Sequence, residues 1–259
     1  MTANLELSQK FDFAKSLVCS AVAFLRAQMD QPFEVTEKTD FTDLVTDMDQ
    51  KVQDFLMSEI LAVYPEDHFL AEEGDYKQAI GSGKVWVIDP IDGTANFVAQ
   101  KQDFAIVVAY YEDGIGKFGL IYDVMAEQFY YGGGDFDVFC NDEQLVPYKD
   151  KPFSQFLLAI NPGMYHSNHG GVAHLAERVL GVRTYGSAAL SSAKVLTGQL
   201  LGYISHISPW DYAASKIMGE RLGYATVTIE GKQPNFRDRE FIMIVPKVRL
   251  AEIQDILEG

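Results

Sequence analysis

The sequence has 259 residues with 47% hydrophobic side chains, and its 37 acidic and 21 basic residues give a formal net charge of −16. This composition predicts a globular chain with a large core, and it argues against a nucleic-acid polymer as partner, because such polymers are bound mainly through Lys and Arg. A small phosphorylated ligand would also be repelled unless bound cations reversed the local field, so metal ions are expected.

The sequence does not favour a membrane or a secreted protein. No stretch approaches the roughly 18 consecutive apolar residues of a membrane helix. Glu6 and Asp12 precede the apolar run 17–24, and no small-residue cleavage site follows it, so no secretory signal is expected. Cys19 and Cys140 are too few for a disulfide framework or a Cys-rich zinc site, and we expect a cytoplasmic location.

Apolar residues recur at helical spacing over 11–25 and 52–63, which predicts two helices at the start of the chain. Short strand-like stretches follow, separated by Gly, Asp and charged residues, and they predict an antiparallel meander. These stretches are 68–71, 85–88, 104–111, 118–124, 128–131 and 137–140. The segment GIGKFG, 114–119, matches a dinucleotide-binding fingerprint, but no predicted helix follows it, so it is interpreted as a hairpin turn.

From residue 156 onwards the predicted strands and helices alternate. Strands are expected at 156–160, 182–185, 201–205 and 241–245, and helices at 172–180, 188–196, 209–222 and up to residue 257. The chain is therefore assigned to the α+β class, with a mixed second sheet. A hinge near 147–152 would divide it into an N-terminal half, 1–147, and a C-terminal half, 148–259.

Three histidines, His166, His169 and His174, lie close together in the segment HSNHGGVAH. They could bind zinc, but a polar loop rich in Gly, Asn and Ser also supplies histidines without any metal. A short match of this kind has low specificity, so the role of the cluster stays open.

Four acidic segments stand out, and each has a purely structural explanation. Thr46 and Asp49 in VTDMDQ fit a helix capping box, as do Ser208 and Asp211 in SPWDYAAS. The segments LAEEGD and IDPIDGT could each be a charged turn.

Taken together, the four segments predict a metal site. Asp89 ends an apolar strand, and because Pro90 cannot donate to a ladder, the chain is expected to leave the sheet there and to turn Asp92 back towards Asp89. Carboxylates are ligands that Mg²⁺ prefers, and Glu72 and Asp211 could complete the set from other elements.

The same stretch predicts a phosphate cradle. Gly93 permits a close approach of the backbone to a ligand. If a short helix begins at Thr94, its free N–H groups face outward, which suits a phosphate oxygen.

Four segments, DLVTDMDQKV, EE at 72–73, DPIDGTANF and WDYAA, resemble the signatures of the inositol monophosphatase family, the magnesium-dependent, lithium-sensitive sugar-phosphate phosphatases. Their order and spacing match from about Lys38 to Val245, which is nearly the whole chain. The resemblance implies the layered α/β/α/β/α sugar-phosphatase fold, with most metal ligands in the first half, and a homodimer.

The resemblance also implies roles for single residues. The metal ligands would be the carboxylates of Glu72, Asp89, Asp92 and Asp211 and the main-chain carbonyl of Ile91, holding two or three Mg²⁺ ions with Mn²⁺ as a substitute. Asp49 and Thr94 match the pair that orients the attacking water, and Glu73 matches an acid behind the ligands. The substrate side would be formed by Asp92, Gly93, Thr94 and, in RTYGSAAL, Ala188.

The implied reaction is hydrolysis of a small phosphorylated alcohol by metal-activated water, without a covalent intermediate. A haloacid-dehalogenase-type phosphatase would need D-x-D-G-T, whereas D-x-x-D-G-T would point the two acids to opposite faces of an extended chain. A non-catalytic sensor of a phosphorylated metabolite could use the same pocket, although every proposed ligand and water-orienting residue is present.

The substrate is less constrained than the chemistry. Family members dedicated to inositol phosphate carry a glutamate seven positions before the late aspartate, where this chain has Ile204, followed by Ser205 and His206. Because isoleucine cannot accept hydrogen bonds from ring hydroxyls, strict inositol specificity is not expected unless Ser205 or His206 compensates. A broad phosphomonoesterase is expected, with the 2′-phosphate of NADP, the 3′-phosphate of adenosine bisphosphate and fructose 1,6-bisphosphate as alternatives to inositol monophosphate.

Overall fold

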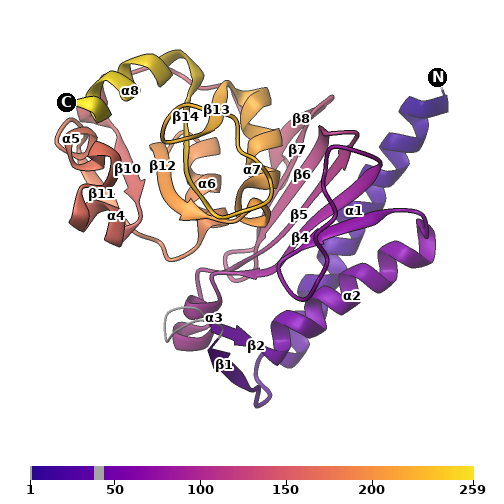
Figure 1. Ribbon diagram of the computed structural model, residues 1–259. Helices are drawn as coiled ribbons and strands as arrows, with labels where there is room; N and C mark the ends of the chain where they lie inside the picture. The colour runs from indigo at the N-terminus through magenta and orange to yellow at the C-terminus, as the bar shows by residue number, and fades with distance from the viewer. Residues whose placement is uncertain (1, 38–43) are drawn as a thin grey trace.

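The computed structural model describes residues 2–37 and 44–259, so Lys38, where the family resemblance begins, lies outside the described part. The elements form five layers of alternating helix and sheet (Figure 1). The helices are α1 (Thr2–Gln28), α2 (Asp47–Val63), α3 (Thr94–Gln100), α4 (Pro162–Ser167), α5 (Val172–Ala176), α6 (Ala188–Leu196), α7 (Pro209–Leu222) and α8 (Leu250–Glu258), with 3₁₀ turns at Phe153–Gln155, His169–Gly171 and Lys247–Arg249. The layered α+β fold that the resemblance implied is confirmed.

The first sheet has seven strands in the order β3-β4-β5-β6-β7-β8-β9. They are β3 (His68–Ala71), β4 (Lys84–Asp92), β5 (Ala105–Glu112), β6 (Ile115–Asp123), β7 (Gln128–Gly133), β8 (Phe136–Cys140) and β9 (Glu143–Gln144). From β4 onwards the neighbours are antiparallel, as a meander requires, and the hairpin turn in GIGKFG lies at its start, around Gly114. The edge strand β3 pairs with β4 in parallel, because the link 72–83 returns the chain to the same end of the sheet.

The second sheet has five strands in the order β11-β10-β12-β14-β13 and is mixed, as expected. They are β10 (Leu157–Ile160), β11 (Gly181–Arg183), β12 (Leu200–Ile207), β13 (Tyr224–Thr228) and β14 (Glu240–Pro246), and a separate hairpin joins β1 (Val35–Glu37) to β2 (Leu44–Thr46). The sequence patterns missed β13. It follows α7 after a single left-handed residue, Gly223, so no polar loop separates the two apolar patterns.

Three apolar cores hold the layers together. Helices α1 and α2 cover one face of the seven-stranded sheet, α6 and α7 fill the space between the two sheets, and α5 and α8 cover the outer face of the five-stranded sheet (Figure 1). In β4 the side chains alternate between two of these cores: Val85 and Val87 face α6 and α7, whereas Trp86 and Ile88 face α1 and α2. None of the helices in the described ranges combines the length and apolar character needed to span a membrane.

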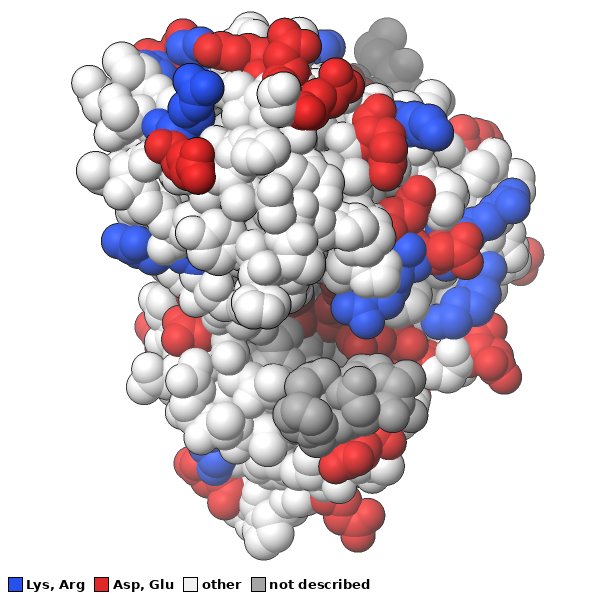
Figure 2. Space-filling view, turned by 60° about the vertical axis from the view of Figure 1, so that its left-hand side comes forward, with Lys and Arg blue, Asp and Glu red and all other residues white. Residues whose placement is uncertain are grey.

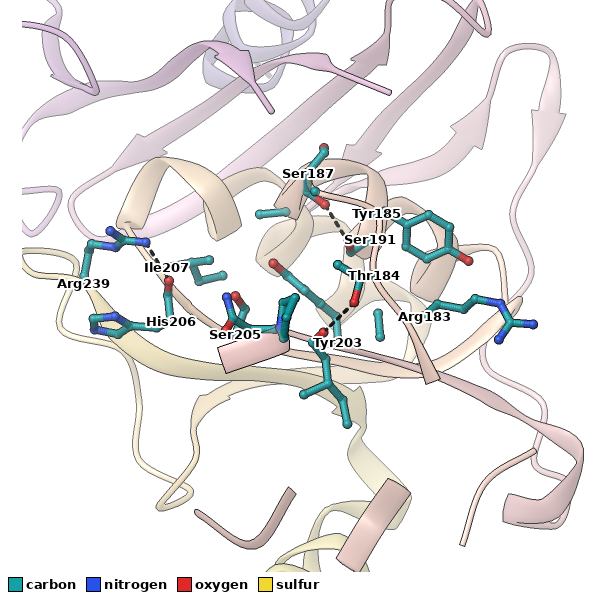
Figure 3. Close-up of a pocket in the computed structure, with 16 residues that line it drawn as sticks. Arg183, Thr184, Tyr185, Ser187, Ser191, Tyr203, Ser205, His206, Ile207 and Arg239 are labelled. Carbon is teal, nitrogen blue, oxygen red and sulfur yellow. Dashed lines mark hydrogen bonds between the residues drawn. The ribbon is translucent and has the colours of Figure 1, made fainter. Parts of the chain in front are cut away.

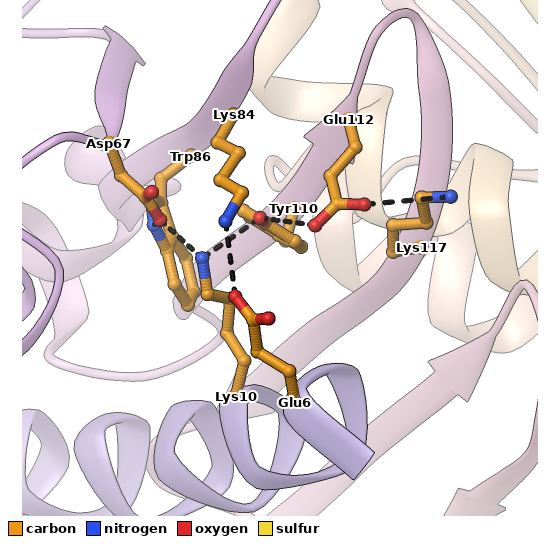
Figure 4. Close-up of polar contacts among 8 residues, drawn as sticks. All are labelled: Glu6, Lys10, Asp67, Lys84, Trp86, Tyr110, Glu112 and Lys117. Atoms are coloured by element: carbon orange, nitrogen blue, oxygen red, sulfur yellow. Dashed lines mark hydrogen bonds and ion pairs between the residues drawn. The ribbon is translucent and has the colours of Figure 1, made fainter. Parts of the chain in front are cut away.

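A buried polar network fixes α1 to the sheet (Figure 4). The Lys10 ammonium group lies 2.5 Å from the Asp67 carboxylate and donates to the Tyr110 hydroxyl at 2.9 Å, while Trp86 Nε1 donates to the same carboxylate at 2.9 Å. The ammonium group also lies 4.2 Å from the ring centre of Tyr64 and 4.3 Å from that of Tyr110. Burial lowers the pKa of Lys10, and the carboxylate and the aromatic faces offset part of that cost.

Candidate active site

A β-bulge places Asp89 and Asp92 on the same side of the sheet. Asp89 lies opposite Val107 and Asp92 opposite Ala105, so β4 advances three residues while β5 advances two. Residues three apart in a regular strand point to opposite faces, and the extra residue cancels that difference. The sequence suggested that the chain leaves the sheet at Pro90, but the strand continues to Asp92. The proline sits within the irregular step, where a ladder hydrogen bond is not needed.

The side chain of Asp92 is fixed from the other half of the chain by the start of α6. Its two carboxylate oxygens accept hydrogen bonds from the main-chain N–H groups of Ala188, at 3.1 Å, and Ala189, at 2.9 Å. The hydroxyl of Ser187, which is also the N-cap of α6, donates to the same carboxylate. The positive end of a helix is thus aimed at a buried carboxylate.

Asp211 reaches the same place from the first turn of α7. The capping box predicted for Ser208 and Asp211 is present, with Pro209 at the start of the helix, and one carboxylate oxygen of Asp211 accepts from the Ser208 N–H at 2.7 Å. Ligand atoms of Asp89, Asp92 and Asp211 lie within 4.8 Å of one another, and this is the single group of three or more His, Cys, Asp or Glu side chains in the described chain that could hold a metal ion.

The three carboxylates repel one another in a dry environment. Burial, followed by the charge of Asp92, raises the pKa of Asp211 to about 8. Burial also raises the pKa of Asp92 to about 6, although the hydrogen bonds from Ser187 and α6 oppose the shift. The pKa of Asp89 is raised well above its ordinary range by burial and by the charge of Glu72. No Lys or Arg within 2–37 and 44–259 forms an ion pair with these three aspartates.

The two carboxylate oxygens of Asp49 make different contacts: one caps a helix and the other faces Thr94. One oxygen accepts from the Thr46 N–H at 2.7 Å and from the Thr46 hydroxyl at 2.6 Å, which completes the predicted capping box of α2. The other lies 3.2 Å from the Thr94 hydroxyl, which is also 3.1 Å from the main-chain oxygen of Ile91. Burial raises the pKa of Asp49 to about 6. The structure thus brings Asp49, Thr94 and Ile91 together.

The two glutamates that follow β3 occupy different environments. The carboxyl group of Glu72 is hydrogen-bonded to that of Asp89, so it lies at the edge of the aspartate cluster. Glu73 is buried, and its backbone is held on both sides by the side-chain amide of Gln53 in α2, at 2.9 Å and 2.8 Å. Sequence reasoning did not identify Gln53, because a glutamine on a helix face carries no signal by itself.

The bend after Asp92 requires a glycine. Gly93 has φ +93°, and a side chain there would meet the main-chain oxygen of Asp103 at 3.1 Å and the Ser187 Cβ at 3.2 Å. Helix α3 begins at the next residue, Thr94, as expected. Its first N–H groups therefore lie beside the aspartate cluster, where a phosphate oxygen could accept from them.

A pocket of about 360 Å³ opens beside the cluster, between β10, β12 and the start of α6 (Figure 3). Ala188, the predicted substrate contact, lines it together with Tyr203 and Ser205. Ile204 does not: it points to the opposite face of β12, fully buried in the core under α5 and α8. The space-filling view shows a hollow on one face of the molecule with acidic side chains inside it (Figure 2).

The three clustered histidines do not form a shared metal group in the described chain. His169 instead stacks on the ring of Phe241, with 3.9 Å between ring centres, and His206 stacks on the same ring at 4.4 Å. His169 therefore packs on the strand beside the pocket.

Comparison with known proteins agrees with the geometry of the site. A model described as "Inositol monophosphatase family" matches residues 6–256. The chain belongs to the inositol monophosphatase family. It is accordingly a hydrolase of phosphoric monoesters.

Two curated relatives are similar over most of the chain. The chain is 35% identical over 238 residues to an inositol-1-monophosphatase of Bacillus subtilis, with 90% of each chain covered. It is 29% identical over 235 residues to a fructose-1,6-bisphosphatase/inositol-1-monophosphatase of Thermotoga maritima, again with 90% of each chain covered.

Solved structures of this family share the fold. A staphylococcal IMPase-II superposes with a TM-score of 0.87 at 31% identity, covering 96% of this chain and 94% of the other. An IMPase/NADP phosphatase complexed with Mg²⁺ and phosphate gives a TM-score of 0.90 at 25% identity, covering 98% and 97%.

Proposed function

We propose that this chain is a Mg²⁺-dependent phosphomonoesterase that hydrolyses small phosphorylated alcohols without a covalent enzyme intermediate. The observation that carries the proposal is the group of Asp89, Asp92 and Asp211, of which the first two are buried and the third is half-buried. The group lies next to the Asp49–Thr94 pair, and the pocket adjoins it through Ser187 and Ala188, which bind the Asp92 carboxylate. The Mg²⁺ in a related IMPase/NADP phosphatase structure supports it.

The donor set fits magnesium. Mg²⁺ prefers oxygen ligands, and Asp89, Asp92 and Asp211, with Glu72 and the Ile91 carbonyl, offer only oxygen atoms. The three aspartates raise one another's pKa values and have no basic partner among the described residues, so a divalent cation would remove an unfavourable repulsion. We propose two or three Mg²⁺ ions at these residues, with Mn²⁺ as a substitute.

The protein's own residues position the reaction. When bound, Mg²⁺ supplies Lewis-acid stabilisation of phosphoryl oxygens and lowers the pKa of water. Ionised Asp49 accepts the hydroxyl hydrogen of Thr94, which leaves a Thr94 lone pair to accept a hydrogen bond from the attacking water. The N–H groups after Gly93 hold a phosphate oxygen. Glu73, fixed by Gln53, keeps the preceding Glu72 in place.

We propose a broad substrate range in which inositol monophosphate is one substrate. Ile204 faces the core, so it neither binds nor rejects ring hydroxyls, and the pocket offers the hydroxyl of Ser205 instead. Inositol monophosphate and 2′-AMP are both bound in solved structures of a staphylococcal relative, which supports this range. Phosphatase activity on NADP, adenosine bisphosphate or fructose 1,6-bisphosphate is the alternative on the same site.

The decisive experiment compares Asp211→Asn with Asp75→Asn in a phosphate-release assay. Asparagine can still accept from the Ser208 N–H, so the helix cap survives, but a charged metal ligand is lost. We expect kcat/KM for inositol 1-phosphate to fall by about 100-fold or more in saturating Mg²⁺, since several kcal/mol of charge stabilisation are lost. Asp75, an exposed acid in the neighbouring turn, should be replaceable without loss.

Two outcomes of this assay would point elsewhere. Near-normal activity of Asp211→Asn would sink the metal assignment. Absence of Mg²⁺-dependent release by the unaltered chain from every phosphomonoester tried would favour a non-catalytic sensor, and a phospho-aspartate trapped on Asp89 would indicate a covalent route.

We further propose that the chain is a cytoplasmic homodimer, as the family resemblance implies. Light scattering of the purified protein should give twice the mass of one chain. The mass of a single chain at micromolar concentration would contradict the dimer.

A further inference from the structure

The substrate pocket is adjacent to a second cavity. The pocket reaches from Ser187 and Ala188, next to Asp92, to His206 and Arg239 at its other end (Figure 3). The second cavity, of about 310 Å³, shares three lining residues with the pocket: Asn161, His206 and Arg239. A ligand bound by its phosphate at the aspartate cluster therefore has space to extend past Arg239.

Arg239 is held in place without being neutralised. Its guanidinium donates to the main-chain oxygen of His206 at 3.0 Å, and it forms no ion pair with a carboxylate in the described ranges. Arg221 and Arg249, in contrast, are each paired with an aspartate. Arg183 also lines the pocket, but its side chain points away from the other lining residues in Figure 3.

Among the described residues that line this end of the pocket, Arg239 is the one with a fixed positive charge. His206 stacks on Phe241, and its pKa is lowered by burial and by the charge of Arg239, so the ring is neutral at pH 7. Between the two ends lies Tyr203, a pocket residue. Burial raises the pKa of its hydroxyl, the charges of Asp92 and Asp211 raise it further, and the charge of Arg239 lowers it. The pocket thus has an acidic end and a basic end.

We propose that Arg239, with the neighbouring wall of Asn161 and His206, forms a subsite for a second anionic group, so that the favoured substrates are phosphomonoesters whose alcohol carries another phosphate. The inference rests on the proposed function, because the scissile phosphate is placed at the aspartate cluster. A chain with a net charge of −16 repels such a bisphosphate unless each phosphate meets a cation, and Arg239 supplies a positive charge for the phosphate that does not lie at the metal site.

Matched substrate pairs test the subsite. Fructose 1,6-bisphosphate and fructose 1-phosphate differ by one phosphate, as do adenosine 2′,5′-bisphosphate and 2′-AMP. The ratio of kcat/KM for the bisphosphate to that for the monophosphate is measured in each pair with saturating Mg²⁺. We expect Arg239→Gln to lower this ratio about tenfold or more, since a charge-assisted hydrogen bond is lost. The pair that responds identifies the sugar or the nucleotide as the source of the second phosphate.

Three controls separate charge from structure. Arg237→Gln, an exposed arginine two residues away that does not line the pocket, should keep the unaltered ratio. Arg239→Lys should give a ratio between those of Arg239→Gln and the unaltered protein, because the positive charge remains. Raising the ionic strength should lower the ratio in the unaltered protein and have a smaller effect in Arg239→Gln.

Two results would overturn the subsite. Equal losses of kcat/KM on both members of each pair would show that Arg239 only supports the fold. Unchanged kcat/KM for all four substrates would show that no second anion is bound there. Neither result would affect the metal-dependent release of phosphate from inositol 1-phosphate, whose loss in Asp211→Asn tests the proposed function separately.

Discussion

At the scale of single residues, Asp49 shows how one carboxylate serves two purposes. One oxygen accepts the capping hydrogen bond from the Thr46 N–H at the start of α2, and the other faces the Thr94 hydroxyl. A helix cap and a catalytic contact are therefore compatible explanations of the same motif. The capping box fixes the carboxylate so that Thr94 can be oriented with little freedom, and positioning of this kind is sensitive to small displacements.

The pKa of Asp49 predicts an acid limit to the activity. Burial raises this pKa to about 6 in the metal-free protein, and the ionised carboxylate is a stronger acceptor of the Thr94 hydroxyl hydrogen than the protonated group. Because nearby Mg²⁺ lowers the pKa of a carboxyl group, kcat in saturating Mg²⁺ should decrease with falling pH from a point at or below about pH 6. Asp49→Asn should be slow at all pH values, and its kcat should not show this decrease at acid pH. If the same decrease of kcat at acid pH persists in Asp49→Asn, the titrating group is another one.

We expect the loss of the Ser187 hydroxyl to change the affinity for metal rather than the binding of substrate. Its hydroxyl donates to the Asp92 carboxylate, as do two N–H groups of α6 that would remain in Ser187→Ala. We expect the Mg²⁺ concentration for half-maximal activity to rise about tenfold, at the lower end of the range for groups behind metal ligands. Ser192→Ala, which removes a buried hydroxyl of the same helix bonded only to the Ala188 carbonyl, is the matched control. Equal effects of the two would show that the contact between Ser187 and Asp92 does not set the metal affinity.

The sequence predicted the aspartates better than their surroundings. Asp89 and Asp92 are recognisable because Gly93 and Thr94 follow them, and the capping boxes at Asp49 and Asp211 have a local signature. The bulge that aligns Asp89 with Asp92 depends on pairing with β5, which has no local signal. The same holds for Ile204, whose position in the strand was known but whose facing side depends on the register of β12 with β14.

At the scale of elements, the attachment of α1 depends on an internal ion pair. Lys10 and Asp67 are both nearly fully buried, so removing the cation leaves a carboxylate whose remaining side-chain donor, within the described residues, is Trp86. Lys10→Met should lower the free energy of unfolding by about 3–5 kcal/mol. Urea unfolding followed by tryptophan fluorescence measures this. Lys15→Met removes a surface pair with Asp12 in the same helix and should cost less than about 1 kcal/mol; comparable losses would show that burial of the pair is not the cause.

Regular elements were predictable where their ends were marked in the sequence. Helix α7 begins at the Ser208 capping box with Pro209 and ends before Gly223, and β5 is a continuous apolar run bounded by charged residues, so both nearly coincide with the predicted ranges. Short elements whose identity depends on a neighbour were missed or misplaced, as with β13 and with the parallel pairing of β3. The division of the chain into halves at 147 stays a prediction, although each of the two large sheets lies on one side of that boundary.

At the scale of the whole molecule, the aspartate cluster links pH, metal and stability. A carboxyl group whose pKa is higher in the folded than in the unfolded chain binds protons more strongly when folded, so its contribution to stability decreases as pH rises from about 4 through the folded pKa. For Asp211 this range extends to about pH 8. Mg²⁺ favours the ionised carboxylates and should reverse the loss.

Thermal unfolding should show this directly. In EDTA, the melting temperature at pH 8 should be lower than at pH 5.5, and Asp89→Asn should raise it at pH 8 by roughly 4 °C, since each kcal/mol shifts a domain of this size by roughly 2–4 °C. Mg²⁺ should stabilise the unaltered protein more at pH 8 than at pH 5.5, and Asp89→Asn much less at either pH. A variant that is less stable than the unaltered protein in EDTA at pH 8 would contradict the repulsion.

The position of α6 and α7 between the two sheets has a consequence for synthesis on the ribosome. The first sheet is complete in sequence at Gln144, but the face that carries Val85 and Val87 is covered by helices that end only at Leu222. At about 5–20 residues per second, translation from Gln144 to Asp211 takes roughly 3–13 s. During that interval the nascent chain has an uncovered apolar sheet and three of the proposed carboxylate ligands without the fourth. A chain cut short before α7 therefore loses its catalytic centre and its solubility together.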